Sequence, residues 1–271
     1  MNPVAFSIGN FEIRWYSILI AIAVIISYFM IKSECRKFQI KSEFVFNLMF
    51  WTIIFGIIGA RLYYVLFNLD YYSNHLMETV QIWKGGLAIH GGLAFGLITL
   101  FVYCKKYGMR VGKILDIVVV PLLLAQAIGR WGNFFNSEAY GSIVEYNTLI
   151  NLKIIPQFVI DNMYIDGAYR LPMFYFESLW CLLGFIVTLF LRRGKYLKES
   201  QIFGFYLIWY GVARFVIEIF RADSLMFGNF KIARIVSVAM VIAGIIVEII
   251  QAQKPKLDDL YNRVEVEEIR F

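Results

Sequence analysis

Long apolar stretches restrict most strongly what this chain can fold into. A helix needs about 20 mostly apolar residues to cross the hydrocarbon core of a bilayer. Seven stretches are about that long, at residues 14–31, 44–67, 87–104, 114–131, 173–191, 202–220 and 232–250. The chain is 60% hydrophobic and 17% charged, which excludes an ordinary soluble domain and a disordered chain. We therefore predict an all-α polytopic membrane protein with seven transmembrane helices, in which residues 1–271 form one integral membrane domain.

The distribution of basic residues predicts the orientation in the membrane. The connections after the first, third, fifth and seventh stretches each carry four Lys or Arg residues: Lys32, Arg36, Lys37 and Lys41; Lys105, Lys106, Arg110 and Lys113; Arg192, Arg193, Lys195 and Lys198; Lys254, Lys256, Arg263 and Arg270. The opposite connections carry one or two each. By the positive-inside rule the N-terminus is outside and the tail, residues 251–271, is cytoplasmic, where we expect it to be helical or frayed. Because the basic residues flank membrane spans, they do not indicate a nucleic-acid partner.

The ends of the chain and its longest connection complete the predicted architecture. The first apolar stretch lacks a preceding basic region and a following small-residue cleavage site, so we expect a retained span. The external segment 132–172 is too short for a domain with its own core, and we interpret it as an extracytoplasmic arm or cap between spans four and five. Cys35, Cys104 and Cys181 lack CxxC spacing and neighbouring histidines, so neither a disulfide framework nor a metal site is predicted.

Polar residues recur near the outer ends of six spans. Charged side chains within a span cost several kcal/mol on insertion scales and so require an explanation. From a rise of 1.5 Å per residue, we place these residues at one level in the outer leaflet: Tyr16, Arg61, His90, Arg130, Glu177 and Arg214. Each alone could be a side chain that snorkels to the interface. Their convergence favours a shared site instead.

The sixth span carries one polar stripe on an otherwise apolar helix. Tyr210, Arg214, Glu218 and Arg221 fall within an arc of about 80° at 100° per residue. Arg214 and Glu218 could simply neutralise each other four residues apart and fix helix packing. Two arginines at headgroup depth, Arg130 and Arg214, otherwise indicate an anionic ligand such as a phospholipid headgroup, because the guanidinium fork matches phosphate.

His90 lies in the segment Gly85–Leu93, which contains four glycines. The glycines could only permit close helix packing. They could also leave room for a substrate beside an imidazole that exchanges protons near neutral pH. The segment by itself leaves both interpretations open.

The run Gly129–Gly141 resembles the signature G-R-x-G-N-F-x-N-x-E-x-x-G of the bacterial prolipoprotein diacylglyceryl transferase family, with all eight fixed positions matched. The resemblance extends along nearly the whole chain, through Phe6–Gly9, Trp15-Tyr16, Gly59–Leu62, His90–Leu93 and Tyr210–Arg221. The chain departs from the family pattern at three flanks, where it has Leu171-Pro172, Ala222-Asp223 and Ala233-Arg234.

The resemblance implies an enzyme of the bacterial plasma membrane. It would transfer the diacylglyceryl group of phosphatidylglycerol to the lipobox cysteine of a prolipoprotein signal peptide, without a metal or organic cofactor. We expect the catalytic residues to be His90, Arg130, Arg214 and Tyr210. We expect the residues that bind substrate to be Arg130, Asn133, Asn136, Glu138, Gly141, Tyr16, Arg61, Glu218 and Arg221.

Three alternatives remain open at this stage. A lipid or anion transporter could use the same arginines, although the inner halves of the spans are apolar apart from Asp116 and Glu248. Asn133, Asn136 and Glu138 could cap the fourth span rather than shape the mouth of the site. His90 is our candidate acceptor of the thiol proton, but the field of the arginines alone could produce enough thiolate.

Overall fold

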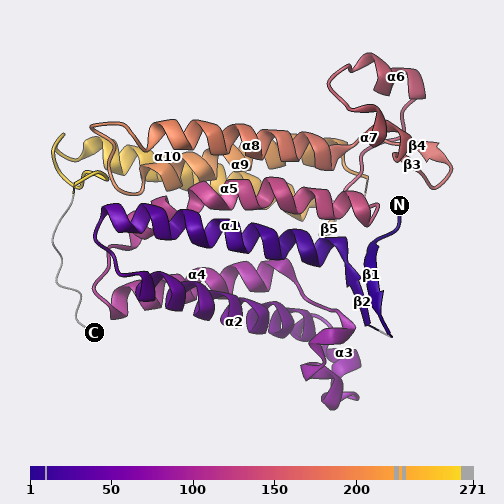
Figure 1. Cartoon of the computed structure of the whole chain (residues 1–271), viewed down its shortest axis with the longest axis horizontal. Coiled ribbons are helices and arrows are strands. Elements are labelled where there is room, and N and C mark those ends of the chain that lie inside the picture. Colours follow the sequence, from indigo (N-terminus) through magenta and orange to yellow (C-terminus); the bar gives the residue numbers. More distant parts are fainter. Residues whose placement is uncertain (10, 223–225, 228–229, 264–271) are drawn as a thin grey trace. The chain divides into compact units, whose positions relative to one another are not determined.

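Helices dominate the computed structural model, which describes residues 1–9, 11–222, 226–227 and 230–263. Asp223 of one divergent flank and residues 264–271 of the predicted tail lie outside this description. Within the described residues, six helices are long and apolar enough to cross a membrane (Figure 1): α1 (Trp15–Lys37), α2 (Ser42–Leu66), α5 (Val111–Phe135), α8 (Met173–Leu191), α9 (Gln201–Phe220) and α10 (Ile232–Gln253). The prediction of a mainly helical, polytopic membrane protein is confirmed at this level.

The predicted third span forms helix α4 (Ile89–Lys106), but it is not one of the six. It has 18 residues, three of them glycine, with His90 near one end and two lysines at the other. These residues lower its mean hydropathy relative to the other long helices. The role of α4 as a membrane span, and with it the total of seven spans, therefore stays a prediction.

Three short antiparallel hairpins accompany the helices in the part of the chain that the structure describes. Strands β1 (Val4–Ile8) and β2 (Phe11–Arg14) precede α1, β3 (Tyr164–Ile165) pairs with β4 (Ala168–Tyr169), and β5 (Met226–Phe227) pairs with β6 (Phe230–Lys231). The expectation of a purely helical chain did not include them. Strands of two to five residues are too short to give a clear alternating pattern in the sequence.

The described residues divide into two compact units, which we treat separately. Unit 1 contains residues 1–30 and 115–263, and unit 2 contains residues 31–114. The boundaries between the units fall within α1 and α5.

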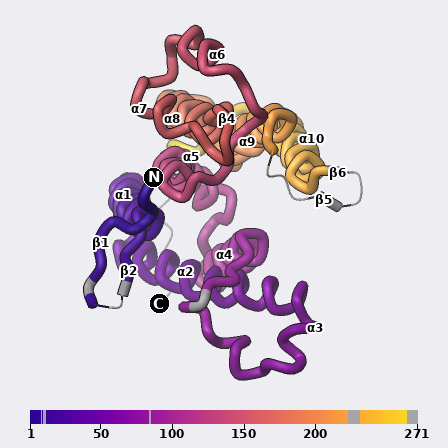
Figure 2. Tube along the Cα trace, turned by 90° about the vertical axis from the view of Figure 1, so that its right-hand side faces the viewer, coloured from indigo at the N-terminus to yellow at the C-terminus, as the bar shows by residue number. Residues whose placement is uncertain are grey.

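Unit 2 is built on the close packing of α2 and α4 (Figure 2). A Cβ atom at Gly91 of α4 would collide with the carbonyl oxygen of Gly59 and the side chain of Tyr63 on α2. Glycine at position 91 therefore allows the two backbones to approach each other. Between these helices the chain forms α3 (Leu69–Tyr72) and two 3-10 turns, η1 (Leu76–Val80) and η2 (Ile82–Lys84).

In unit 1, α9 packs against both α8 and α10 (Figures 1 and 2). Helix α5 joins α8 through the hydroxyl of Ser178, which donates to the carbonyl of Ala127 at 2.8 Å. The connection from α5 to α8 contains α6 (Tyr146–Asn151) and α7 (Gln157–Asp161). Its apolar residues, including fully buried Leu149 and Val159, form one cluster with residues at the ends of α5 and α8.

The described part of the tail after α10 is docked on unit 1, where we had expected a helical or frayed segment. Tyr261 is fully buried, and its backbone N–H donates to the carbonyl of Leu197 at 2.8 Å. The amide of Asn262 donates to the carbonyls of Arg192 and Gly194, just past the end of α8. These contacts hold the tail against the connection between α8 and α9.

Candidate active site

Three helices of unit 1 meet at the carboxylate of Glu177, on α8. Its Oε1 forms an ion pair with Nη2 of Arg130, from α5. Its Oε2 lies 3.4 Å from Nη1 of Arg214, from α9. The Glu177 side chain is only 1% exposed, and the two arginines are 19% and 15% exposed. One buried carboxylate thus bridges the two arginines for which the sequence predicted an anionic ligand.

Tyr210 and Glu218 complete this polar network. The hydroxyl of Tyr210 accepts a hydrogen bond from Nη2 of Arg130 at 3.2 Å and donates to Glu177 at 3.3 Å. Glu218, also 1% exposed, lies 2.7 Å from Nη2 of Arg214. The ion pair four residues apart that the sequence allowed is present, but Arg214 is shared between two carboxylates. Two guanidiniums and two carboxylates make the network formally neutral.

The network continues along α5 and α9 through residues that the sequence analysis did not assign. The amide of Gln126 donates to the hydroxyl of Tyr206 at 3.0 Å, and the ring of Tyr206 stacks on that of Tyr210 with centroids 5.9 Å apart. Each precedes a predicted site residue by four positions, Arg130 and Tyr210 respectively, so a search along the helix face could have found them.

Hydrogen bonds within the signature segment join the last turn of α5 to the residues that follow it. Glu138 accepts hydrogen bonds from the side-chain amides of Asn133 at 3.3 Å and Asn136 at 3.5 Å. Its backbone N–H also donates to the carbonyl of Asn133 at 2.9 Å. These contacts join the carboxylate to the two amides of the same segment. They fit the capping interpretation, and the binding of substrate by these residues stays a prediction.

Gly141 brings the end of the signature beside the end of α9. Its N–H donates to the carbonyl of Leu171 at 2.8 Å, and it forms a β-bridge with Arg221. The next residue, Ser142, donates its N–H to the carbonyl of Phe220 at 3.0 Å. The two predicted binding residues Gly141 and Arg221 are therefore neighbours.

Tyr16, at the start of α1, packs its ring against Gly132 of the signature. A Cβ atom at Gly132 would overlap this ring. Beside it, Trp15 stacks on Phe135 with centroids 5.1 Å apart. The structure thus brings Tyr16 to the signature segment. It also explains why position 132 is glycine, since the Tyr16 ring leaves no room for a side chain there.

Replacing Gly132 by Ala should displace the Tyr16 ring and destabilise the protein by about 1–3 kcal/mol, the usual cost of overpacking. Thermal melting of the purified protein measures the effect. The matched control is Gly129→Ala in the same helix, where an added methyl group meets no heavy atom within 4 Å. This control should keep or raise the melting temperature, since Ala favours a helix over Gly. Equal melting temperatures for wild type and Gly132→Ala would contradict the steric explanation.

Arg61 of unit 2 is 7% exposed and binds backbone carbonyls. Its Nε donates to Thr79 at 2.8 Å, and Nη2 donates to Glu78 at 2.5 Å. Its Nη1 donates to Gly85 and Gly86 at 2.8 and 3.0 Å. Four of the five guanidinium N–H groups thus hold the connection between α2 and α4. This describes a positioning role, while the predicted contact with substrate stays a prediction.

Replacing Arg61 by Met should loosen the segment 76–88 and destabilise the protein by about 3 kcal/mol, because buried carbonyls lose a charged partner. Limited proteolysis should then cleave this segment faster than in wild type. Lys105→Met, at an exposed position on α4, is the control and should leave cleavage unchanged. A wild-type cleavage pattern for Arg61→Met would contradict the positioning role.

His90 is the second residue of α4, in unit 2, and is exposed. The centroid of its ring lies 6.2 Å from that of Tyr63 on α2. We predicted it near the outer end of the third span, and the structure places it in the first turn of α4, at one end of that helix.

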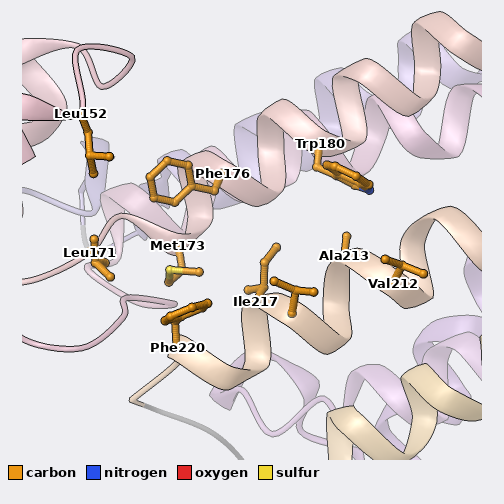
Figure 3. Close-up of a pocket in the computed structure, with 10 residues that line it drawn as sticks. Leu152, Leu171, Met173, Phe176, Trp180, Val212, Ala213, Ile217 and Phe220 are labelled. Atoms are coloured by element: carbon orange, nitrogen blue, oxygen red, sulfur yellow. The ribbon is translucent and has the colours of Figure 1, made fainter.

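An apolar pocket of about 400 Å³ lies between α8 and α9 (Figure 3). In Figure 3, Met173, Phe176 and Trp180 from α8 face Val212, Ala213, Ile217 and Phe220 from α9. Leu152 and Leu171, from the connection that precedes α8, also line it. This apolar lining suits a hydrocarbon chain. A charged ligand of unit 1 would instead bind at the network around Glu177.

The fold and the network define a class of protein: a polytopic helical membrane protein with a buried, charged site formed by three of its helices. The family model described as prolipoprotein diacylglyceryl transferase matches residues 3–250. The chain belongs to this family.

Similar bacterial proteins carry the name phosphatidylglycerol–prolipoprotein diacylglyceryl transferase. One from Streptococcus uberis is 44% identical over 255 residues, which cover 94% of this chain and 96% of that protein. One from Listeria monocytogenes is 42% identical over 268 residues, covering 97% and 96%. A third, from Staphylococcus saprophyticus, is 41% identical over 255 residues, covering 94% and 91%.

Proposed function

We propose that this chain transfers the diacylglyceryl group of phosphatidylglycerol to the lipobox cysteine of prolipoprotein signal peptides. A thioether forms and glycerol phosphate is released, in the first step of bacterial lipoprotein maturation. Membership of the family over nearly the whole chain carries this proposal. The Arg130–Glu177–Arg214 network supports it, since the reaction develops negative charge on a phosphate.

The reaction breaks the bond between the glyceryl carbon and the phosphate oxygen. The cysteine sulfur attacks that saturated carbon, and the bonding electron pair stays on the oxygen. Arg130 and Arg214 bind the phosphate and stabilise the charge that it gains, because guanidinium donors in a low-dielectric site favour the charged leaving group. Tyr210 hydrogen-bonds Arg130 and contributes a hydroxyl at the same place.

The remaining unit 1 residues shape the site around this centre. Asn133, Asn136 and Glu138 form its mouth at the C-terminal end of α5, with Tyr16 packed against the same segment. Glu218 holds Arg214, and the paired Gly141 and Arg221 border the site at the end of α9. Their contacts with lipid hydroxyl and phosphate oxygens are part of the proposal.

His90 accepts the proton of the cysteine thiol in this proposal. An imidazole is the ordinary protein group for proton transfer near neutral pH, and general base catalysis contributes about 10²–10⁴-fold. Its exposure in the first turn of α4 leaves its ring accessible. Arg61 supports the chain that leads into this turn, since it binds the carbonyls of Gly85 and Gly86.

Both polar residues in the inner halves of the spans have local partners, which disfavours a transport path. The carboxylate of Asp116 accepts the backbone N–H groups of Ser200 at 2.6 Å and Phe203 at 2.8 Å, at the start of α9. Glu248 accepts a hydrogen bond from Gln201 at 3.2 Å. Asp116 and Glu248 therefore both stabilise local structure at the start of α9.

The membrane arrangement is part of the same proposal. Residues 1–271 form a single integral membrane domain, with the N-terminus outside and the C-terminus cytoplasmic. Helix α4 is the third span and completes the set of seven, because 18 residues extend about 27 Å, close to the roughly 30 Å hydrocarbon core. The connection between α5 and α8 is the extracytoplasmic arm, and the charge asymmetry of the connections supports this orientation.

A direct assay tests the proposed function. Purified protein is incubated with phosphatidylglycerol and a lipobox peptide, and mass spectrometry should detect the diacylglyceryl mass on the cysteine. A peptide with Ser in place of that cysteine is the control and should gain no mass. Folded protein that leaves the cysteine peptide unmodified would overturn the proposal.

A further inference from the structure

The proposed chemistry assigns no step to Glu177, yet its carboxylate lies at the centre of the network. Each of its oxygens faces a different guanidinium, so the carboxylate spans Arg130 and Arg214 as a bound phosphate would. The hydroxyl of Tyr210 donates to the same carboxylate at 3.3 Å. Helices α5, α8 and α9 therefore all supply groups that converge on one side chain.

Because Glu177 is buried, its charge acts strongly on the groups around it. Its side chain is 1% exposed, so solvent screens its field only weakly. Without Glu177, the two arginines and Glu218 would leave one net positive charge at this place. With Glu177 the four side chains are formally neutral.

The net charge of these four side chains matters because the phosphate gains a negative charge during the reaction. Phosphatidylglycerol has a phosphodiester with one negative charge. The released glycerol phosphate is a monoester whose second pKa is near 6, so it is mostly a dianion above neutral pH. A positively charged site would therefore bind the product more tightly than the substrate, and product release would become slow.

We propose that Glu177 is a positioning residue with two effects: it fixes the two guanidiniums, and its charge keeps the site from trapping the phosphate product. This rests on the proposed phosphate role of Arg130 and Arg214. Glu177 touches the arginines and acts on the substrate through them.

Two substitutions separate the charge from the geometry. Glu177→Gln removes the charge and keeps the shape, so the inhibition constant of glycerol phosphate should fall about tenfold or more, with a lower kcat. Glu177→Asp keeps the charge and shortens the side chain by one methylene. It should lower kcat while the inhibition constant stays within about twofold of wild type. A role in packing alone would lower kcat in both variants without moving the inhibition constant.

Glu248→Gln is the matched control, since it makes the same change in α10 at a residue outside the network. It should leave the inhibition constant unchanged, and an equal fall there would overturn the proposal. Arg130→Lys and Arg214→Lys test the phosphate role itself and should raise the constant. If neither does, the phosphate assignment fails. If they do and folded Glu177→Gln does not differ from wild type, the role of Glu177 alone is overturned.

A measurement on the wild-type protein keeps the proposal testable if Glu177→Gln does not fold. Glycerol phosphate is a monoester whose phosphate carries two negative charges at pH 8. The diester in which the same phosphate joins two glycerols carries one. If the network is neutral, the inhibition constants of the monoester and the diester should differ by less than tenfold at pH 8. A preference of tenfold or more would overturn the proposal.

Discussion

Replacing Arg130 or Arg214 by Gln is expected to lower turnover about 100-fold or more. Removing one preorganised donor to a developing anion typically costs a factor of about 10²–10³. Here each arginine also holds the buried carboxylate of Glu177, so its loss disturbs the remaining guanidinium as well. The rate of diacylglyceryl transfer to a lipobox peptide, followed by mass spectrometry, measures the effect.

Lysine at either position provides a second measurement. It keeps one positive charge for Glu177 but cannot present the planar fork of N–H donors that matches both carboxylate and phosphate. We therefore expect Arg130→Lys and Arg214→Lys to fold better than the Gln variants and still turn over slowly. Arg193→Gln, past the end of α8, is the control and should turn over at the wild-type rate. Near-normal turnover in both Gln variants would contradict the assignment.

The long helices could be predicted from the sequence because their signal is local. The span predicted at 173–191 coincides with α8, and that predicted at 202–220 differs from α9 by one residue. Apolar length is sufficient to locate such a helix, since the bilayer fixes the number of residues needed. Helix α1 extends past the prediction by six residues, most of them polar, where hydropathy falls but backbone hydrogen bonding continues. Helix α5 exceeds its prediction by three residues at the start and four at the end, and these include two glycines, Lys113 and Asn133.

The partners within the site could be predicted only in part. Arg214 and Glu218 lie four residues apart on one helix, and their pairing follows from helix geometry. Glu177 was predicted near one end of its span and lies near the start of α8, but its two arginines come from other helices, and no spacing in the sequence encodes that contact. Arg61 is a harder case, because its partners are backbone carbonyls, which every residue carries.

His90→Gln is expected to reduce turnover at neutral pH about 100-fold, with retained binding of phosphatidylglycerol. Glutamine can still donate and accept hydrogen bonds but cannot accept a proton, so only the base function is removed. The substrate thiol, with an ordinary pKa of about 8.5, must then ionise unaided. Below that pH its thiolate fraction rises about tenfold per pH unit, and kcat/KM of the variant should rise with it.

The pH profile distinguishes a base from a packing residue. If His90 accepts the proton, the wild-type rate should depend on pH less steeply than that of the variant, and the two rates should converge as the pH approaches 8.5. His75→Gln is the matched control, because that imidazole is exposed, stacked on Tyr71 and bonded to its backbone carbonyl. It should leave both rate and profile unchanged. A His90→Gln profile that runs parallel to wild type at a lower rate would assign His90 to packing or orientation, and the thiolate would then have to form in the field of the arginines alone.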